Sequence, residues 1–218
     1  MLKDDEGHLN WAGIIEAASA GFGMCLFSLY VHSQSFPAVL SFLGFALVAV
    51  ALSRAVLTSS SVFQLFGLTR IRRKDVIPIA CGVVVGIVTG IWYRVHCGWT
   101  FFPQAFSYFI FVAALIGGAE ELLYRGYLQC RVKTLGVVGA VLVAALFHTA
   151  YKTSLFMFPD IPAAMDIRFL ATWTFLGGLL FGGLRVFCGN IYLPLAAHIS
   201  FDIIVYSNFA HAPWWVWA

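Results

Sequence analysis

Charged residues are scarce in this chain, since Asp, Glu, Lys and Arg together make up 11% of its 218 residues. A soluble domain usually carries about 25%, because a surface that faces water must be covered by polar groups. At the same time, 61% of the residues are hydrophobic, and the mean hydropathy is +0.88. The shortage of charge excludes a soluble enzyme and a disordered chain. The net charge of +3 is too small to indicate a nucleic-acid partner.

Cysteine is also sparse and unpatterned. The five cysteines are dispersed, form no CxxC pair and are odd in number, which argues against a disulfide framework or a zinc site. We therefore expect no metal and no other cofactor. The N-terminus is acidic and lacks the basic segment of a signal peptide, so we expect the first apolar stretch to be retained as a span.

The apolar sequence suffices for seven membrane-spanning helices, which at about 20 residues each would use about 140 residues. We predict an all-α, polytopic transmembrane helix bundle of seven or eight spans, with residues 1–218 forming a single integral membrane domain in a lipid bilayer. The expected spans are Trp11–Tyr30, Pro37–Leu57, Val76–Trp92, Phe106–Gln129, Leu135–Tyr151, Phe169–Phe187 and Ile191–Asn208.

Basic residues are divided unevenly between the two ends of these spans. All thirteen Lys and Arg except Arg94, Lys152 and Arg168 fall on the side of the N-terminus and of the loops after spans two, four and six. The positive-inside rule then places the N-terminus in the cytoplasm. The basic segment 70–74 is expected at the membrane surface, and the aromatic tail 213–217 is typical of a bilayer interface.

Ionisable residues inside spans are costly and by default mark function. Residues 120–125 have the sequence EELLYR. Glu121 and Arg125 are four apart with the acid first, which favours an ion pair on one helix face. Glu120 points about 100° away and has no base three or four positions later. The spacing predicts that Arg125 neutralises Glu121 and that Glu120 is available as a general base. The alternative is a helix end among lipid headgroups.

Two histidines also lie within expected spans. His148 is late in the fifth span, while His198 and Asp202 share a face of the seventh. Asp202 could fix the tautomer of His198, or both could face an oxyanion; the alternative for each is a packing role. Glu with two His is a plausible metal-ligand set, but no HExxH motif is present, so metal binding is the weaker hypothesis. Glu16 is expected among headgroups.

The segment 120–129, EELLYRGYLQ, resembles the EExxxR motif of the CAAX protease and bacteriocin-processing (CPBP) family of intramembrane peptidases. His148 stands where the FxxxH motif of that family ends, and residues 198–202 resemble its HxxxN or HxxxD motif. The resemblance covers residues 105–207 and implies a catalytic core at about 105–208. One departure from the family pattern is Ala144, where Phe is usual, which predicts looser packing near the site.

The resemblance implies a glutamate-dependent endopeptidase. It implies that Glu120 activates a water with help from His148, that His198 and Asp202 form or support an oxyanion site, and that Glu121 with its arginine holds the architecture. Asp202 is a second departure, because Asn is commoner there. An ionised Asp would repel an oxyanion, so we expect Asp202 either to be protonated or to act through His198.

The implied substrates are membrane-associated proteins or peptides. Processing of C-terminal sorting anchors or leader peptides in a prokaryotic inner membrane is favoured, with prenylated CAAX termini as the alternative. The glycine-rich faces of spans three and six are expected to admit the substrate. Two hypotheses of other classes are a non-catalytic immunity or scaffold protein of the same fold and a transporter, and the lack of inverted repeats argues against the latter.

Overall fold

The computed structural model describes residues 9–31, 37–157 and 166–208, and these ranges contain helices and no strand. The predicted all-α fold is confirmed. The N-terminal acidic residues, the loop with Pro159 and Pro162, and the aromatic tail lie outside the described residues. The longer helices are α1 (Trp11–Val31), α2 (Ala38–Thr58), α4 (Val76–His96), α7 (Gly136–Ser154), α8 (Ile167–Cys188) and α9 (Tyr192–Tyr206).

A further helix, here called the central helix, is continuous from Phe109 to Arg131. It consists of α5 (Phe109–Glu120), the π-helical segment η2 (Glu121–Leu128) and α6 (Gln129–Arg131). Three short elements complete the described fold: α3 (Val62–Leu65), η1 (Arg73–Asp75) and η3 (Lys133–Leu135). The seven long helices match the seven expected spans, with ends that differ by a few residues.

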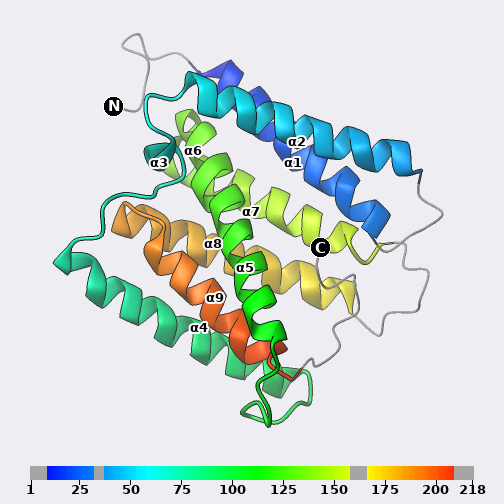
Figure 1. Cartoon of the computed structure of the whole chain (residues 1–218), viewed down its shortest axis with the longest axis vertical. Helices are drawn as coiled ribbons and strands as arrows, with labels where there is room; N and C mark the ends of the chain where they lie inside the picture. Colours follow the sequence, from blue (N-terminus) through cyan, green and yellow to red (C-terminus); the bar gives the residue numbers. More distant parts are fainter. Residues whose placement is uncertain (1–8, 32–36, 158–165, 209–218) are drawn as a thin grey trace.

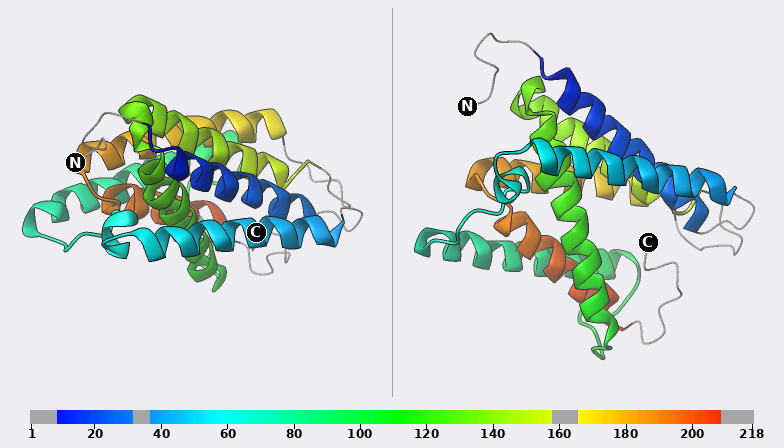
Figure 2. Two further views of the ribbon diagram at one scale, coloured as in Figure 1. Left: turned by 90° about the horizontal axis from the view of Figure 1, so that it is seen from above. Right: turned by 45° about the horizontal axis from the view of Figure 1, so that its top comes forward.

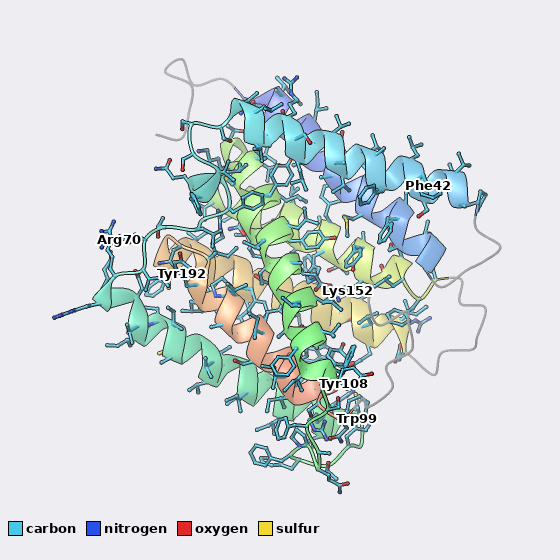
Figure 3. The ribbon with its side chains drawn as sticks, in the orientation of Figure 1. Phe42, Arg70, Trp99, Tyr108, Lys152 and Tyr192 are labelled. Carbon is cyan, nitrogen blue, oxygen red and sulfur yellow. The ribbon has the colours of Figure 1, made fainter. Side chains whose placement is uncertain are left out.

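Five segments of the described chain are long and apolar enough to cross a membrane, and they contain α1, α2, α4, α7 and α8. Helix α9 is apolar but shorter, with 15 residues. Large hydrophobic side chains such as Phe42 and Phe187 point outward (Figure 3 labels Phe42), whereas alanines such as Ala17 and Ala55 are buried. An apolar outer surface over a core of small residues is the arrangement expected of helices surrounded by lipid.

The central helix positions the other helices around it (Figure 1). It crosses between the α1–α2 pair and the α4–α9 pair, with α7 and α8 behind it. Figure 2 shows it steeply inclined to the other helices. Helix α9 packs on α4 and α5, while α7 packs on α8 and α1. Residues from α5, α7 and α9 therefore meet in the interior.

Helices α4 and α9 approach almost to backbone contact. A Cβ atom on Gly86 would lie 2.0 Å from the carbonyl oxygen of Ala197, and one on Gly82 would lie 2.4 Å from that of Leu193. The glycine stripe of α4 thus permits close packing, as predicted. The expectation that this face admits substrate is wrong, because α9 fills it.

The glycines of α8 divide into two kinds. Cβ atoms on Gly178 and Gly182 would lie within 3 Å of side chains on α7, whereas those on Gly177 and Gly183 would meet nothing within 4 Å. The glycine-rich face of α8, which was expected to admit the substrate, is therefore partly covered by α7 and partly open.

Gly86→Ala is expected to destabilise the protein by about 1–3 kcal/mol, the usual cost of overpacking a close contact. The measurement is the midpoint of thermal unfolding in detergent. Gly183→Ala is the matched control, because its Cβ meets nothing within 4 Å and Ala is the better helix former by about 1 kcal/mol. Equal midpoints for the two variants would contradict this account of α4–α9 packing.

Glu16 is buried in the bundle, so its side chain does not extend toward headgroups as expected. Its carboxylate pairs with Arg54 of α2 at 2.7 Å and with Arg131 of α6. Two arginines neutralise the buried acid, which offsets the free-energy cost of removing its charge from water. This cluster ties the α1–α2 pair to the central helix.

Arg94 is buried at the end of α4 and holds the end of α9. Its guanidinium donates to the carbonyl oxygens of Ile204 and Val205 at 3.2 and 3.4 Å, and to the carbonyl of Thr100 at 2.9 Å. The last carbonyls of a helix have no partner within it, so a cation there stabilises the helix end. Arg94 therefore fixes the helix that carries His198, and it belongs to α4 and not to the loop after the expected span.

Candidate active site

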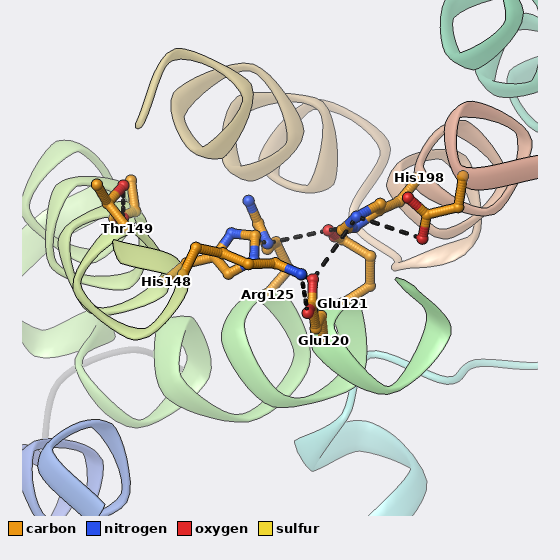
Figure 4. A network of polar contacts seen from close by, with 9 residues as sticks. Glu120, Glu121, Arg125, His148, Thr149 and His198 are labelled. Atoms are coloured by element: carbon orange, nitrogen blue, oxygen red, sulfur yellow. Dashed lines mark hydrogen bonds and ion pairs between the residues drawn. The ribbon is translucent and has the colours of Figure 1, made fainter. Parts of the chain in front are cut away.

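The six residues that the sequence singled out converge in the interior of the bundle (Figure 4). The central helix, α7 and α9 each contribute, and all six side chains are buried. The residues brought together are Glu120, Glu121, Arg125, His148, His198 and Asp202.

The two glutamates lie where the central helix changes from α to π geometry. Glu120 is the last residue of α5, and Glu121 is the first of the π-helical segment η2. Such segments are rare and occur frequently at functional sites. Within η2, Arg125 Nη1 lies 2.9 Å from Glu121 Oε1, and both side chains are at most 1% exposed. The ion pair predicted from the spacing is therefore present.

His148 is held between a base and an acid. Its Nδ1 lies 3.0 Å from Arg125 Nη1, and its Nε2 lies 3.1 Å from Glu120 Oε2. A guanidinium has donors only, so Nδ1 accepts and the ring proton is on Nε2, which donates to Glu120. The two partners thus select one neutral tautomer. In this tautomer Nε2 donates to Glu120, and Nδ1 is occupied by the donor of Arg125.

His198 has acidic neighbours instead. Its Nδ1 lies 2.8 Å from Glu121 Oε1, while its Nε2 lies 3.7 Å from Glu120 Oε2 and 3.8 Å from Asp202 Oδ2. A carboxylate paired with Arg125 accepts, so Nδ1 carries a proton. The sequence-based hypothesis that Asp202 fixes this tautomer is wrong, because Glu121 makes the hydrogen bond and Asp202 is beyond hydrogen-bond distance.

A glycine of α5 provides the space for Asp202. A Cβ on Gly117 would lie 2.3 Å from Asp202 Oδ2 and 3.2 Å from His198 Cδ2. Sequence reasoning missed this position. The available signal was the Gly117–Gly118 pair, which is separated from the acidic motif by one alanine in an otherwise apolar helix.

Lys152 is a further member of the site that the sequence did not reveal. Its ammonium forms an ion pair with Glu120 Oε1, and its side chain is 22% exposed. Glu120 has no base three or four positions later on its own helix, as the sequence shows, but it has a basic partner from another helix. The signal was spacing: Lys152 follows His148 by four residues and shares its face of α7.

The two carboxylates of the site consequently have different surroundings. Glu121 is fully enclosed at 0% exposure, between Arg125 and His198, whereas Glu120 is 5% exposed and borders Lys152, the most exposed side chain of the group. Buried charges persist when each is paired. The arrangement therefore closes Glu121 off completely and leaves Glu120 slightly exposed beside Lys152.

Several atoms of the site that could bind a metal contact other side chains, whereas Glu121 Oε2 has no hydrogen-bond partner. Glu120, Glu121 and both histidines have the partners described above, and no group of three or more His, Cys, Asp or Glu in the described ranges is arranged to hold a metal ion. The site can carry out proton transfer with the groups that it contains.

Comparison with known proteins identifies the segment that carries this site. Residues 100–204 match the family model described as "Type II CAAX prenyl endopeptidase Rce1-like". A Bacillus subtilis (strain 168) protein with the name "Uncharacterized protein YpbD" is 30% identical over 104 residues, which is 48% of this chain and 47% of that protein. The chain thus matches about half the length of this relative. No solved structure matches the chain.

Proposed function

Since residues 100–204 belong to the Rce1-like family of type II CAAX prenyl endopeptidases, we propose that the chain is an intramembrane endopeptidase in which Glu120 activates a water molecule. The observation that carries the proposal is the unequal burial of two adjacent carboxylates. Glu121 is closed in by Arg125 and His198, whereas Glu120 lies beside the partly exposed Lys152. A general base must reach the proton that it removes, and Glu120 is the carboxylate with that access.

In the proposed reaction, Glu120 takes a proton from water as the water oxygen bonds to the carbonyl carbon of the substrate. The carbonyl oxygen receives the electron pair and becomes an oxyanion. When the intermediate collapses, the C–N bond breaks and Glu120 returns its proton to the leaving nitrogen. His148, which donates to Glu120 Oε2, holds the carboxylate in place during both transfers.

His198 is the proposed donor to the oxyanion. Its Nδ1 donates to Glu121, and its Nε2 faces two carboxylates at 3.7 and 3.8 Å, an arrangement that suits a ring protonated on both nitrogens. A donor aimed at developing negative charge typically contributes about 10²–10³ in rate. Asp202 acts through His198 in this scheme, because an ionised carboxylate would repel the oxyanion.

The proposed substrates are membrane-associated proteins or peptides in a prokaryotic inner membrane, with the N-terminus of the enzyme in the cytoplasm and the catalytic core at residues 105–208. Processing of C-terminal anchors or leader peptides is the proposed class, and cleavage of prenylated termini is the alternative that the family name supplies. A non-catalytic scaffold of the same fold would need none of the proton-transfer geometry around Glu120.

The test is a comparison of membrane-protein termini in cells that produce the wild-type protein or Glu120→Ala. We expect a small set of new termini that depends on Glu120. Membranes washed with a chelator of divalent metals are expected to generate the same termini, which separates the glutamate mechanism from a metal-dependent one. Identical termini in both strains would refute peptidase activity.

A further inference from the structure

Lys152 lies outside the three sequence motifs but contacts the central residue of the site. It stands one helical turn after His148 on α7, and its ammonium pairs with Oε1 of Glu120 while His148 holds Oε2. Figure 3 places Lys152 beside the middle of the central helix. Two groups of the same helix therefore contact the two oxygens of Glu120, an ammonium through an ion pair and an imidazole through a hydrogen bond.

The side chain of Lys152 is turned toward the interior, where its ammonium loses part of its hydration. Lysine ammonium groups are strongly hydrated and usually extend to water, yet this side chain is only 22% exposed. A buried ion pair is retained when its geometry compensates for lost hydration. The ammonium also lies 5.6 Å from the centroid of the Tyr151 ring, within the range of a cation–π interaction.

The other charged groups around Glu120 do not supply it with a permanent counter-charge. Two further acids face it or adjoin it, Glu121 on its own helix and Asp202 on α9, and both repel its negative charge. Arg125 is engaged by Glu121 and His148. Among the described residues, Lys152 brings a permanent positive charge into an ion pair with Glu120 Oε1, whereas the imidazole of His198 lies 3.7 Å from Oε2.

We propose that Lys152 is a positioning residue that holds Glu120 as an oriented carboxylate and supplies the counter-charge for the reaction. When water gives its proton to Glu120, negative charge leaves that carboxylate and appears on the substrate oxygen. The ammonium of Lys152 stays beside Glu120, so the carboxylate keeps its counter-charge and its orientation until the proton is transferred. This inference rests on the proposed function of Glu120 as the general base.

The test compares Lys152→Met, Lys152→Gln and Lys152→Arg in detergent micelles, with a quenched-fluorescent peptide that spans a Glu120-dependent terminus as the probe. Lys152→Met and Lys152→Gln are expected to lower kcat by about 10²-fold with KM within about threefold of the wild-type value. Lys152→Arg keeps the charge and is expected to restore most of kcat. Lys133→Met, at an exposed lysine of η3, is the matched control.

The outcomes separate this inference from the proposed function. If Glu120→Gln is inactive but Lys152→Met and Lys152→Gln keep the wild-type kcat, the role of Lys152 is overturned and Glu120 keeps its own. If all three Lys152 variants, Arg included, lose activity together with their thermal stability, Lys152 is a packing residue and the inference fails. A fully active Glu120→Gln protein overturns both proposals.

Discussion

Glu120→Gln is expected to lower kcat/KM by about 10²–10⁴-fold, the range that general-base catalysis contributes. The amide has the size of the carboxylate and still offers an oxygen to Lys152 or His148, but it cannot accept the proton of the attacking water. The loss should appear in kcat with little change in KM, because the missing interaction exists only in the transition state. The measurement is the initial rate with the peptide probe described above.

Folding of this variant should be preserved. Lys152 loses its counter-charge, but its side chain is 22% exposed and can turn toward water. Asp166→Asn is the matched control, because it removes one carboxylate charge far from the site. Asp166 caps α8 by accepting from the backbone amides of Arg168 and Phe169, and Asn caps a helix equally well. Comparable activity in the two variants would remove Glu120 from the mechanism.

Arg125→Met is expected to cost about 3–5 kcal/mol of stability, the usual effect of leaving one member of a buried ion pair without its partner. Glu121 would remain as a charge at 0% exposure, and His148 would lose the donor that selects its tautomer. Activity should be lost with stability. Thermal unfolding in detergent, followed by tryptophan fluorescence, measures the first effect.

A double variant separates the two consequences of losing Arg125. Glu121→Gln combined with Arg125→Met removes both charges, so most of the stability should return. Activity should stay low, because Arg125 no longer donates to His148 and no carboxylate accepts from His198. Arg70→Met, at an exposed arginine (Figure 3), should leave both quantities unchanged. A double variant no more stable than Arg125→Met would contradict the buried-charge explanation.

Features that depend on neighbours along the chain were predictable. The long apolar stretches predicted seven helices whose ends agree with the observed ones to a few residues, because helix formation in an apolar chain depends on length and hydrophobicity. The pairing of Glu121 with Arg125 followed from a four-residue spacing. The motif residues Glu120, His148 and His198 were recognised by type and order, although their catalytic roles remain predictions.

Features that depend on which helices become neighbours were not predictable. The pairing of Glu16 with Arg54 and Arg131, and of Arg94 with the end of α9, joins residues far apart in sequence. Glu16 and Arg94 lie near the ends of expected spans, so the sequence placed them among headgroups or in a loop. The position of a residue along a span indicates its depth but not which side chains of other helices it contacts. The π geometry of η2 has no signature in the hydrophobic pattern, because the pattern distinguishes apolar from polar faces only.

The sequence by itself determined that the chain is an all-α membrane protein and which residues within its expected spans are ionisable. The tertiary structure decided what each of these charges touches. His148 and Glu120 are 28 positions apart, and His198 and Glu121 are 77 apart, so only helix packing sets their distances. Packing placed one histidine against an arginine and the other among carboxylates. It also brought Lys152 to Glu120, because ion pairing between helices depends on interatomic distance, which spacing along one helix does not define.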